Sequence, residues 1–359
     1  MPDSARRSPT GFGPQHRQCE ASWGPLTLFD DPQEGHSGRM DINGRTHPLI
    51  VVGVDGSRSS VAALAFAKEY AERRHGRLRA VSVWSYPISY NPLPVTWSPK
   101  KDAEFQLRMA SKEVFGHVLP DWYEQAVREG SAARNLLDES RTADALIVGS
   151  RGHGGFAGLL LGSVSAQCAA HSQCPAIVIH ADHTAAGVGS DQTEHPLSAR
   201  GGALVVGYDG SANADDALAW ALAAAEDLGA PVTVVRTWSI DRIPRESSDE
   251  FGHGHSFDDV TAQVRRDLVS ETQSLIDAHP RVAVTLQAAL SQPAEELIRR
   301  SKDASMVVVG SRGRGGFVGL LLGSVSAECA SHGMCPVVVV PAGSRTGSRA
   351  ALNVAAVDG

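Results

Sequence analysis

Short apolar runs alternate along the chain with longer stretches of helical periodicity. Residues 49–54 form the first run, and because it is apolar throughout, it indicates a strand buried on both faces of a sheet. Ser57 can cap a helix that runs to about His75, where Gly76 can end it. The same alternation predicts strands at 78–84, 123–128, 145–149 and 176–180, and helices at 102–118, 132–141 and 162–171.

This pattern occurs twice in the chain. LIVVGVDGS, from Leu49, recurs as ALVVGYDGS, from Ala203, and ALIVGSRGHGGFAGLLLGSVSAQCA, from Ala145, recurs as MVVVGSRGRGGFVGLLLGSVSAECA, from Met306. The offset is 154 residues for the first pair (209 − 55) and 161 for the second (310 − 149), so seven residues are inserted between them. A period this long indicates duplicated domains and excludes a solenoid of short units.

Alternating strands and helices predict an α/β fold, in which each helix crosses over between parallel strands. We expect two tandem doubly wound, Rossmann-like domains, each with a five-stranded parallel sheet of order 3-2-1-4-5 and helices on both faces. The predicted domains are residues 49–180 and 203–341, joined by a flexible linker at 181–202. Residues 1–48 are expected to be disordered, and residues 342–359 to form a flexible tail.

Composition and charge narrow the classes of function. The formal net charge of −7 gives no general attraction to nucleic acid, whose binding needs clustered Lys and Arg. No apolar stretch reaches the ~18 residues of a membrane span, and no apolar segment of an export signal follows Arg6 and Arg7. Five cysteines do not suggest a disulfide framework. We therefore expect a cytoplasmic protein that holds any phosphate by a local site.

The candidate chemistry lies in a glycine-rich segment after the fourth strand of each repeat. Its spacing is G-x2-G-x9-G-S, formed by Gly149, Gly152, Gly162 and Ser163, and again by Gly310, Gly313, Gly323 and Ser324. Glycine lets the backbone approach a ligand, and the final Gly-Ser opens a helix whose free N–H groups attract an anion. The serine hydroxyl adds a donor. The alternative is a glycine-rich turn that only connects strand to helix.

One aspartate follows the first strand of each repeat. In a doubly wound sheet of this order the ligand crevice lies between the first and fourth strands, at their carboxyl ends. Asp55 therefore faces Gly149, and Asp209 faces Gly310. The alternative is a turn role, since D-G-S is a good turn signal.

Charged side chains within the loops are further candidates for contact with phosphate. Arg151, Arg312 and Arg314 can meet phosphate charges directly, although exposed arginine on a glycine loop is common. His153 occupies the place of Arg314 in the first copy. This difference suggests that the two sites are not equivalent.

The glycine spacing in both copies resembles the ATP-binding signature of the universal stress protein family, and the similarity extends over both repeats. The resemblance implies that Asp55 and Asp209 lie by the ribose and adenine, and that Val83 and Thr237 offer backbone groups to adenine. It implies that the loop glycines and serines surround the phosphates. The expected protein is a bacterial, ATP-binding regulator of stress response or growth arrest, with ATP bound with or without Mg²⁺ and hydrolysed slowly or not at all.

Assembly can be predicted from the last strand of each repeat. The runs at 176–180 and 337–340 are apolar and would lie at a sheet edge, which is a liability unless it is paired. In the family this strand pairs with its counterpart in another copy, so here the two domains can pair within one chain. The sequence allows a homodimer as well, and it does not identify a protein partner.

Rival motifs fit less well. A P-loop needs a lysine that the stretch from Gly158 to Ser163 lacks. Gly152, Gly154 and Ala157 fit a dinucleotide fingerprint, but that motif belongs after the first strand, with an acid ~20 residues later.

Two further alternatives concern metal and catalysis. Cys168, His171 and Cys174, which recur as Cys329, His332 and Cys335, supply three metal ligands without a clear fourth. A dedicated ATPase or phosphotransferase would need a positioned water and a metal held by acids, and no base stands beside the aspartates. A purely structural stress protein with empty sites is the third class, and it predicts purification without nucleotide.

Overall fold

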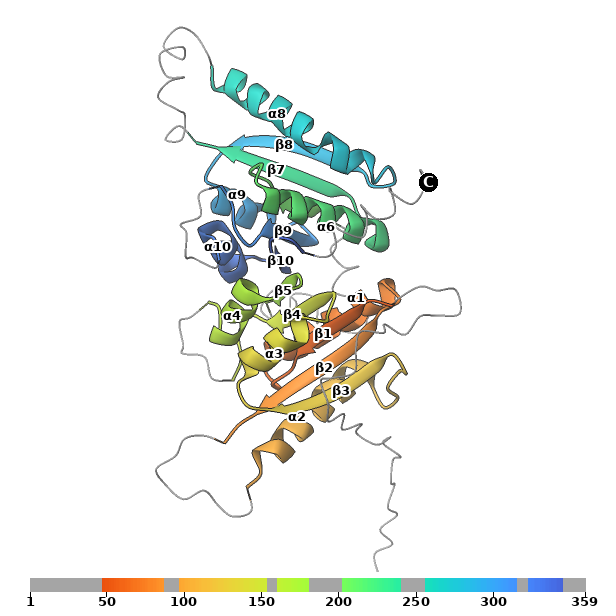
Figure 1. Cartoon of the computed structure of the whole chain (residues 1–359). Helices are drawn as coiled ribbons and strands as arrows, with labels where there is room; N and C mark the ends of the chain where they lie inside the picture. The colour runs from red at the N-terminus through yellow and green to blue at the C-terminus, as the bar shows by residue number, and fades with distance from the viewer. Residues whose placement is uncertain are drawn as a thin grey trace, which may run out of the picture.

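The computed structural model describes residues 47–86, 97–153, 160–180, 202–239, 256–314 and 322–344. Ten strands form one sheet of order β3-β2-β1-β4-β5-β10-β9-β6-β7-β8 (Figure 1). Each half therefore has the order 3-2-1-4-5, with every pairing inside a half parallel, as predicted. The N-terminal extension, the linker and the tail lie outside the described residues, apart from the few residues that flank each domain.

Helices cover both faces of the sheet in each half. The first half contains β1 (Leu49–Gly53), α1 (Arg58–Arg73), β2 (Arg77–Trp84), α2 (Pro99–Phe115), β3 (Tyr123–Glu129), α3 (Ala132–Ser140), β4 (Ala145–Gly149), α4 (Ser163–His171) and β5 (Ala176–Ile179). The second contains β6 (Leu204–Gly207), α6 (Ala212–Leu228), β7 (Val232–Trp238), α8 (Phe257–Asp277), β8 (Val284–Leu290), α9 (Pro293–Arg300), β9 (Met306–Gly310), α10 (Ser324–His332) and β10 (Val337–Val340). Helices α1, α2, α6 and α8 share one face, and α3, α4, α9 and α10 share the other.

The helix boundaries differ by a few residues from those predicted. Ser57 caps α1 as predicted, accepting a hydrogen bond from the Ser60 amide. The helix ends earlier than expected, and His75, with φ of 50°, takes the left-handed backbone position that we expected a glycine to provide. Helix α2 begins at Pro99, because the Ser98 side chain caps it and proline is pre-set for the first helical position.

The seven extra residues of the second repeat lie between β7 and β8. Leu78 in β2 and Val232 in β7 are corresponding positions with the offset of 154, and each pairs with the first residue of the next strand. Those partners, Tyr123 and Val284, are 161 apart. In the same stretch, α8 has 21 residues where α2 has 17.

The central strands are buried on both faces, which explains why their sequences do not alternate. All five residues of β4 and all four of β5 are buried. Ile147 belongs to the apolar layer beneath α1 and α6, while its neighbours Leu146 and Val148 belong to the layer beneath α3 and α4. The two layers stabilise the sheet from both sides.

The two halves join through their last strands, as the sequence predicted. Strand β5 pairs antiparallel with β10, with Ile177 opposite Val338. Next to this seam, Nε2 of His180 lies 3.1 Å from the Ala330 carbonyl oxygen, and Nε of Arg74 lies 2.8 Å from the Asp227 carboxylate. The pairing removes two apolar sheet edges from solvent.

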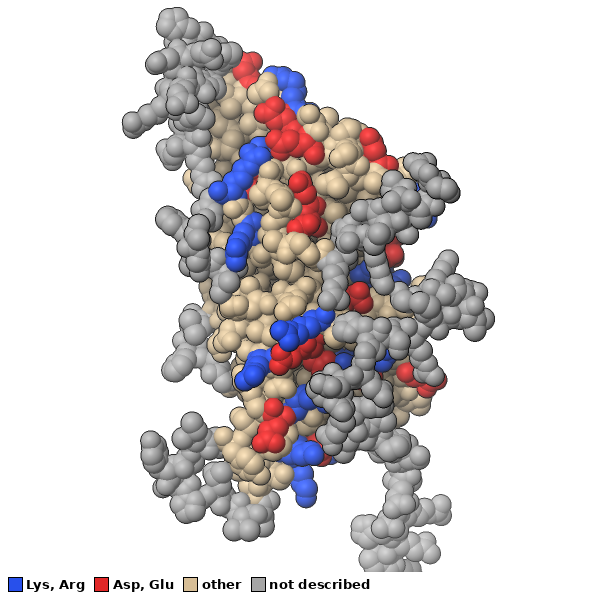
Figure 2. All heavy atoms as spheres, viewed as in Figure 1, with Lys and Arg blue, Asp and Glu red and all other residues tan. Residues whose placement is uncertain are grey.

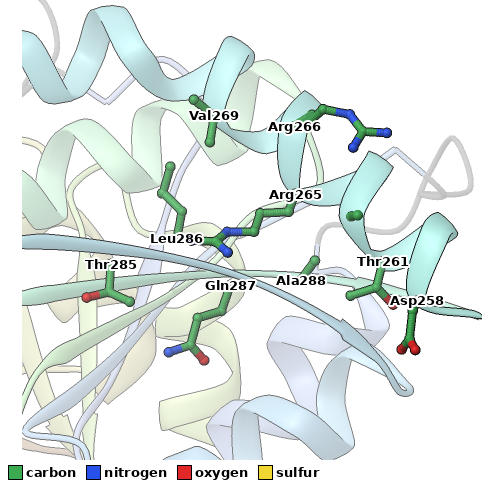
Figure 3. A pocket seen from close by; sticks show the side chains of 10 residues that line it. Asp258, Thr261, Arg265, Arg266, Val269, Thr285, Leu286, Gln287 and Ala288 are labelled. Atoms are coloured by element: carbon green, nitrogen blue, oxygen red, sulfur yellow. The ribbon is translucent and has the colours of Figure 1, made fainter.

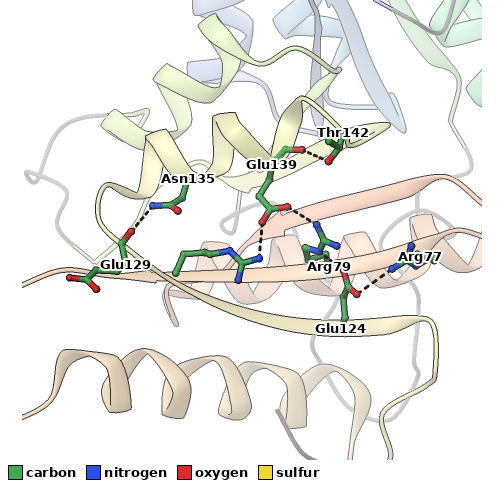
Figure 4. A network of polar contacts seen from close by, with 8 residues as sticks. Arg77, Arg79, Glu124, Glu129, Asn135, Glu139 and Thr142 are labelled. Atoms are coloured by element: carbon green, nitrogen blue, oxygen red, sulfur yellow. Dashed lines mark hydrogen bonds and ion pairs between the residues drawn. The ribbon is translucent and has the colours of Figure 1, made fainter. Parts of the chain in front are cut away.

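The outer edge at β3 is charged. Glu139 of α3 binds Arg79 at 2.7 Å and Arg128 at 3.3 Å, and Glu124 of β3 binds both Arg77 and Arg79 (Figure 4). On the face of the molecule in Figure 2, basic and acidic side chains are interspersed and form no continuous basic stripe. A mixed surface of this kind agrees with the net charge of −7. Among the described residues, no helix is both long and apolar enough to cross a membrane.

Candidate functional site

The carboxyl ends of β1 and β4 bring the D-G-S turn and the glycine loop together. A Cβ on Gly149 would lie 2.6 Å from the backbone carbon of Ser59, so α1 packs directly on the end of β4. A Cβ on Gly152 would collide with Oδ2 of Asp55. Both loop glycines therefore stand where no side chain fits, and the second of them lies against the aspartate.

The Asp55 carboxylate is held by donors from its own turn and from the loop. Oδ1 accepts hydrogen bonds from the Ser57 amide at 3.0 Å and the Ser57 hydroxyl at 2.6 Å, and Oδ2 accepts one from the His153 amide at 3.2 Å. Burial pushes the pKa of Asp55 upward, but these hydrogen bonds, the Ser57 hydroxyl first, hold it below the ordinary value of 3.8. The carboxylate is therefore charged and fixed in orientation.

The helix after the loop is preceded by a glycine, which has no side chain to cap the first-turn N–H groups. Gly162 is the N-cap of α4 and Ser163 its first residue, and no side chain of the described residues caps this helix start. The Gly162 amide donates to the Ser150 carbonyl at 2.7 Å, which folds the end of the loop back on β4. The first-turn N–H groups and the positive end of the helix dipole can thus receive an anion.

The second half repeats this arrangement. A Cβ on Gly313 would collide with Oδ2 of Asp209, and one on Gly310 would lie 2.9 Å from the Asn213 side chain. Oδ1 of Asp209 accepts from the Ser211 amide at 3.0 Å. Gly323 is the N-cap of α10, whose first residue is Ser324, and this helix start also has no side-chain cap within the described part of the chain.

Val83 and Thr237 lie on the strands next to these turns. Each is the second-last residue of its strand, and each strand pairs in parallel with the strand that leads to the aspartate. The Val54 amide donates to the Val81 carbonyl at 2.9 Å, which sets the neighbouring strand beside the turn. Both residues are therefore at the same end of the sheet as the glycine loops.

One position in each site that the sequence did not predict ties the loop to the helix after the first strand. The Ser59 hydroxyl donates to the Arg151 carbonyl oxygen. In the second site, Oδ1 of Asn213 accepts from the Arg312 amide at 2.8 Å and from the Ser311 hydroxyl at 3.1 Å. Both positions follow the D-G-S serine by two residues, and this matched spacing of short polar side chains was the signal available in the sequence.

The loop arginines take part partly through their backbone. Arg151 and Arg312 are exposed, and their main-chain groups make the contacts with Ser59 and Asn213. Arg314 donates from its amide to Asp209 at 2.8 Å and from its guanidinium to the Gly210 carbonyl at 2.8 Å. His153 takes the same place in the first site, where its amide makes the bond to Asp55.

The set of cysteines and histidines is split between the core and the surface, and one surface hollow lies away from the glycine loops. The described residues hold no group of three His, Cys, Asp or Glu side chains placed for a metal, and Cys168 is buried while His171 is exposed. A hollow of about 810 Å³ lies between α8 and β8, where Arg265, Val269 and Leu286 line it (Figure 3). It shares no residue with the glycine loops.

Comparisons with known proteins agree with the repeat and the fold. The model of the universal stress protein family matches residues 49–180 and 202–341. A universal stress protein of Mycolicibacterium smegmatis is 30% identical over 308 residues, covering 83% of this chain and 99% of its own length. One from Mycobacterium tuberculosis is 30% identical over 307 residues, covering 81% and 95%. A universal stress protein structure from Archaeoglobus fulgidus superposes with a TM-score of 0.53 at 17% identity, covering 82% and 98%, which is a likeness of fold.

Proposed function

Because the chain belongs to the universal stress protein family, we propose that it is a regulator of stress response or growth arrest that binds ATP in each of its halves. One observation carries this proposal. In both halves a loop glycine lies against an aspartate carboxylate, and the same loop leads into a helix start without a side-chain cap. A nucleotide presents complementary groups, a diol that an aspartate can bind and phosphates that a helix start attracts.

Different residues of the site would contact different parts of the nucleotide. The backbone at Gly152 and Gly162 and the hydroxyl of Ser163 would hold the phosphates at the start of α4, and Arg151 would add charge at the rim. Asp55 would accept hydrogen bonds from the ribose, and the main chain at Val83 would meet the adenine.

In the second half each of these roles falls to the corresponding position. These residues are Asp209, Thr237, Arg312, Gly313, Gly323 and Ser324, while Gly149 and Gly310 would keep the ends of their strands clear of side chains beside the phosphates.

We propose that ATP acts here as a bound ligand, with slow hydrolysis or none. A general base works best when its pKa lies near the working pH. The pKa of Asp55 is held below 3.8 by hydrogen bonds, among them those from Ser57 and His153, so the carboxylate can still accept a further hydrogen bond but is a weak base for activating water. Mg²⁺ bound with the nucleotide would neutralise phosphate charge.

We further propose that the protein is bacterial and that it is located in the cytoplasm. Cys168, Cys174, Cys329 and Cys335 are all free thiols, as a reducing compartment keeps them.

Calorimetric titration of the full chain with ATP tests the proposal. We expect an affinity near micromolar, which corresponds to about −8 kcal/mol, and loss of binding in the Gly152→Ala, Gly313→Ala double variant. Circular dichroism would verify that the variant is folded. Equal binding by parent and double variant would place the nucleotide elsewhere. Turnover above ~1 s⁻¹ would favour a dedicated ATPase or phosphotransferase instead.

A further inference from the structure

The two sites differ in the side chain that follows the second loop glycine. In the second site the Arg314 guanidinium donates to the Gly210 carbonyl at 2.8 Å, while the Arg314 amide donates to Asp209. The guanidinium lies so close to the turn that a Cβ on Gly210 would collide with it. Arg314 thus fastens the loop across the D-G-S turn by its side chain as well as its backbone.

The first site has a different arrangement at the same place. Its loop residue is His153, and the side chain lying against Gly56 is the neutral Gln106 of α2, 3.2 Å from a Cβ built on that glycine. A histidine side chain is shorter than an arginine and lacks its permanent charge and its five donors. The difference between the sites is therefore a difference in charge and in reach over the turn.

Two other carboxylates around the second site already have partners. Glu271 of α8, which also lies against Gly210, binds Arg236 at 2.8 Å. The Asp215 carboxylate accepts from the Tyr208 hydroxyl at 2.6 Å. Arg314 is exposed, and its guanidinium bonds to the neutral Gly210 carbonyl. The Glu271 carboxylate lies against the same glycine, but its ion pair is with Arg236, so the charge of Arg314 can act on a ligand.

Another charge difference between the sites lies on the helix after the first strand. Arg58 in the first turn of α1 is exposed and corresponds to Ala212 in α6. Arg151 and Arg312 are the same residue type in both loops and do not distinguish the sites. The substitutions His153→Arg in the first site and Arg314→His in the second change only the loop residue. Each therefore measures the effect of that residue while the other differences between the sites stay constant.

We propose that Arg314 makes the second site selective for nucleotides by their phosphate charge. A nucleotide entering beside Asp209 must displace the guanidinium from the Gly210 carbonyl, which costs a charge-assisted hydrogen bond. A triphosphate replaces it with stronger bonds between the guanidinium and phosphate oxygens, whereas a monophosphate has less charge to offer. This inference rests on the proposed function and adds to it a preference of one site for ATP over AMP.

The test measures the ratio of the AMP to the ATP dissociation constant at one site at a time. The full chain with Gly152→Ala reports the second site, and the full chain with Gly313→Ala reports the first; a non-hydrolysable ATP analogue replaces ATP. In the Gly152→Ala chain we expect Arg314→His to lower the ratio of the AMP to the ATP dissociation constant about tenfold, which is the size of one charge-assisted hydrogen bond. We expect Arg314→Lys to lower this ratio less. In the Gly313→Ala chain we expect His153→Arg to raise the same ratio.

The outcomes separate this inference from the proposed function. If the parent binds ATP and the ratio does not change on either exchange, Arg314 does not read phosphate charge, and the site assignment stands. If the parent binds no nucleotide at all, both proposals fall. If Arg314→His weakens the binding of ATP and of AMP equally, the inference is also overturned. That result would indicate that the hydrogen bond between Arg314 and Gly210 only holds the loop in place.

Discussion

At the scale of single residues, the loop glycines have two different reasons to be glycine. Gly149 packs on the backbone of Ser59, whose carbon would lie 2.6 Å from an added Cβ, and backbone cannot move aside. Gly152 faces the carboxylate of Asp55, a side chain and not backbone, and an added methyl group would disturb the hydrogen bonds that hold this carboxylate. One glycine therefore serves packing and the other leaves room at the site.

This distinction predicts different effects of alanine at the two positions. We expect Gly149→Ala to lower the free energy of unfolding by about 1–3 kcal/mol, because the core must shift to admit the methyl group. Gly152→Ala should cost less stability and instead abolish nucleotide binding by the first half. Urea unfolding and calorimetry of the two variants would show the contrast, and equal loss of stability in both would contradict it.

The pKa of Asp55 gives a second prediction. Ser57→Ala removes the hydroxyl that donates to Oδ1 at 2.6 Å, so the pKa of Asp55 should rise toward its ordinary value. Carbon NMR of labelled aspartate would measure it. An unchanged titration would show that the Ser57 hydroxyl does not hold the carboxylate.

The sign of the stability effect follows from the lowered pKa. Because the folded value lies below 3.8, Asp55 stabilises the fold at pH above 3.8 and loses that contribution as pH falls through the folded pKa. The stability difference between the parent and Asp55→Asn should therefore shrink in acid.

The buried thiols give a third prediction. Burial raises the pKa of Cys168, Cys174 and Cys329 to about 12, so these thiols are protonated and poor nucleophiles at neutral pH. In a Cys19→Ser chain, iodoacetamide at pH 8 should label the folded protein slowly and the urea-unfolded protein fully. Mass spectrometry would count the labels, and rapid labelling of the folded chain would contradict the burial.

At the scale of elements, the sequence predicts the number and order of strands better than the helix ends. Unbroken apolar runs identify central strands such as β4, because both of its faces are buried. Helix α2 starts at Pro99, three residues before the predicted start at residue 102, with Ser98 and Pro99 as the usual cap and first-position residues. The matched place of Ser59 and Asn213 after the D-G-S serine marks these positions in the sequence, but the contact of Ser59 with a loop residue 92 positions away appears only in the structure.

The edge strand β3 depends on ion pairs that periodicity does not reveal. Glu139 is 11% exposed and binds both Arg79 and Arg128, so removing its charge leaves two partly buried guanidinium groups without it. We expect Glu139→Gln to lower the free energy of unfolding by about 1–2 kcal/mol. Glu129→Gln, at the exposed end of the same strand, is the matched control and should change stability little. Thermal unfolding would measure both, and an equal effect would contradict a specific role for the network.

At the scale of the whole molecule, the apolar last strands predicted how the halves join, and β5 and β10 pair as expected. The glycine loops could be placed opposite the aspartates from strand order alone. The hydrogen bond between the Arg314 guanidinium and the Gly210 carbonyl could not be predicted, because it depends on the close approach of Gly210 to the loop. Topology is thus readable from the sequence, whereas the difference between the sites requires the packing.

The seam between the halves predicts which contacts hold them together. Val338 is fully buried opposite Ile177, so Val338→Ala should cost about 2 kcal/mol or more. Asp227 is 42% exposed, and Asp227→Asn, which removes its ion pair with Arg74, should cost under about 1 kcal/mol. Urea unfolding of both variants would measure these costs, and a larger loss from Asp227→Asn would show that the ion pair dominates.

A crystal structure of the full chain grown with an excess of a non-hydrolysable ATP analogue tests the central claim most directly. We expect one triphosphate at the start of α4 opposite Asp55, and another at the start of α10 opposite Asp209. Nucleotide found only in the hollow between α8 and β8, or absent from both helix starts, would contradict it.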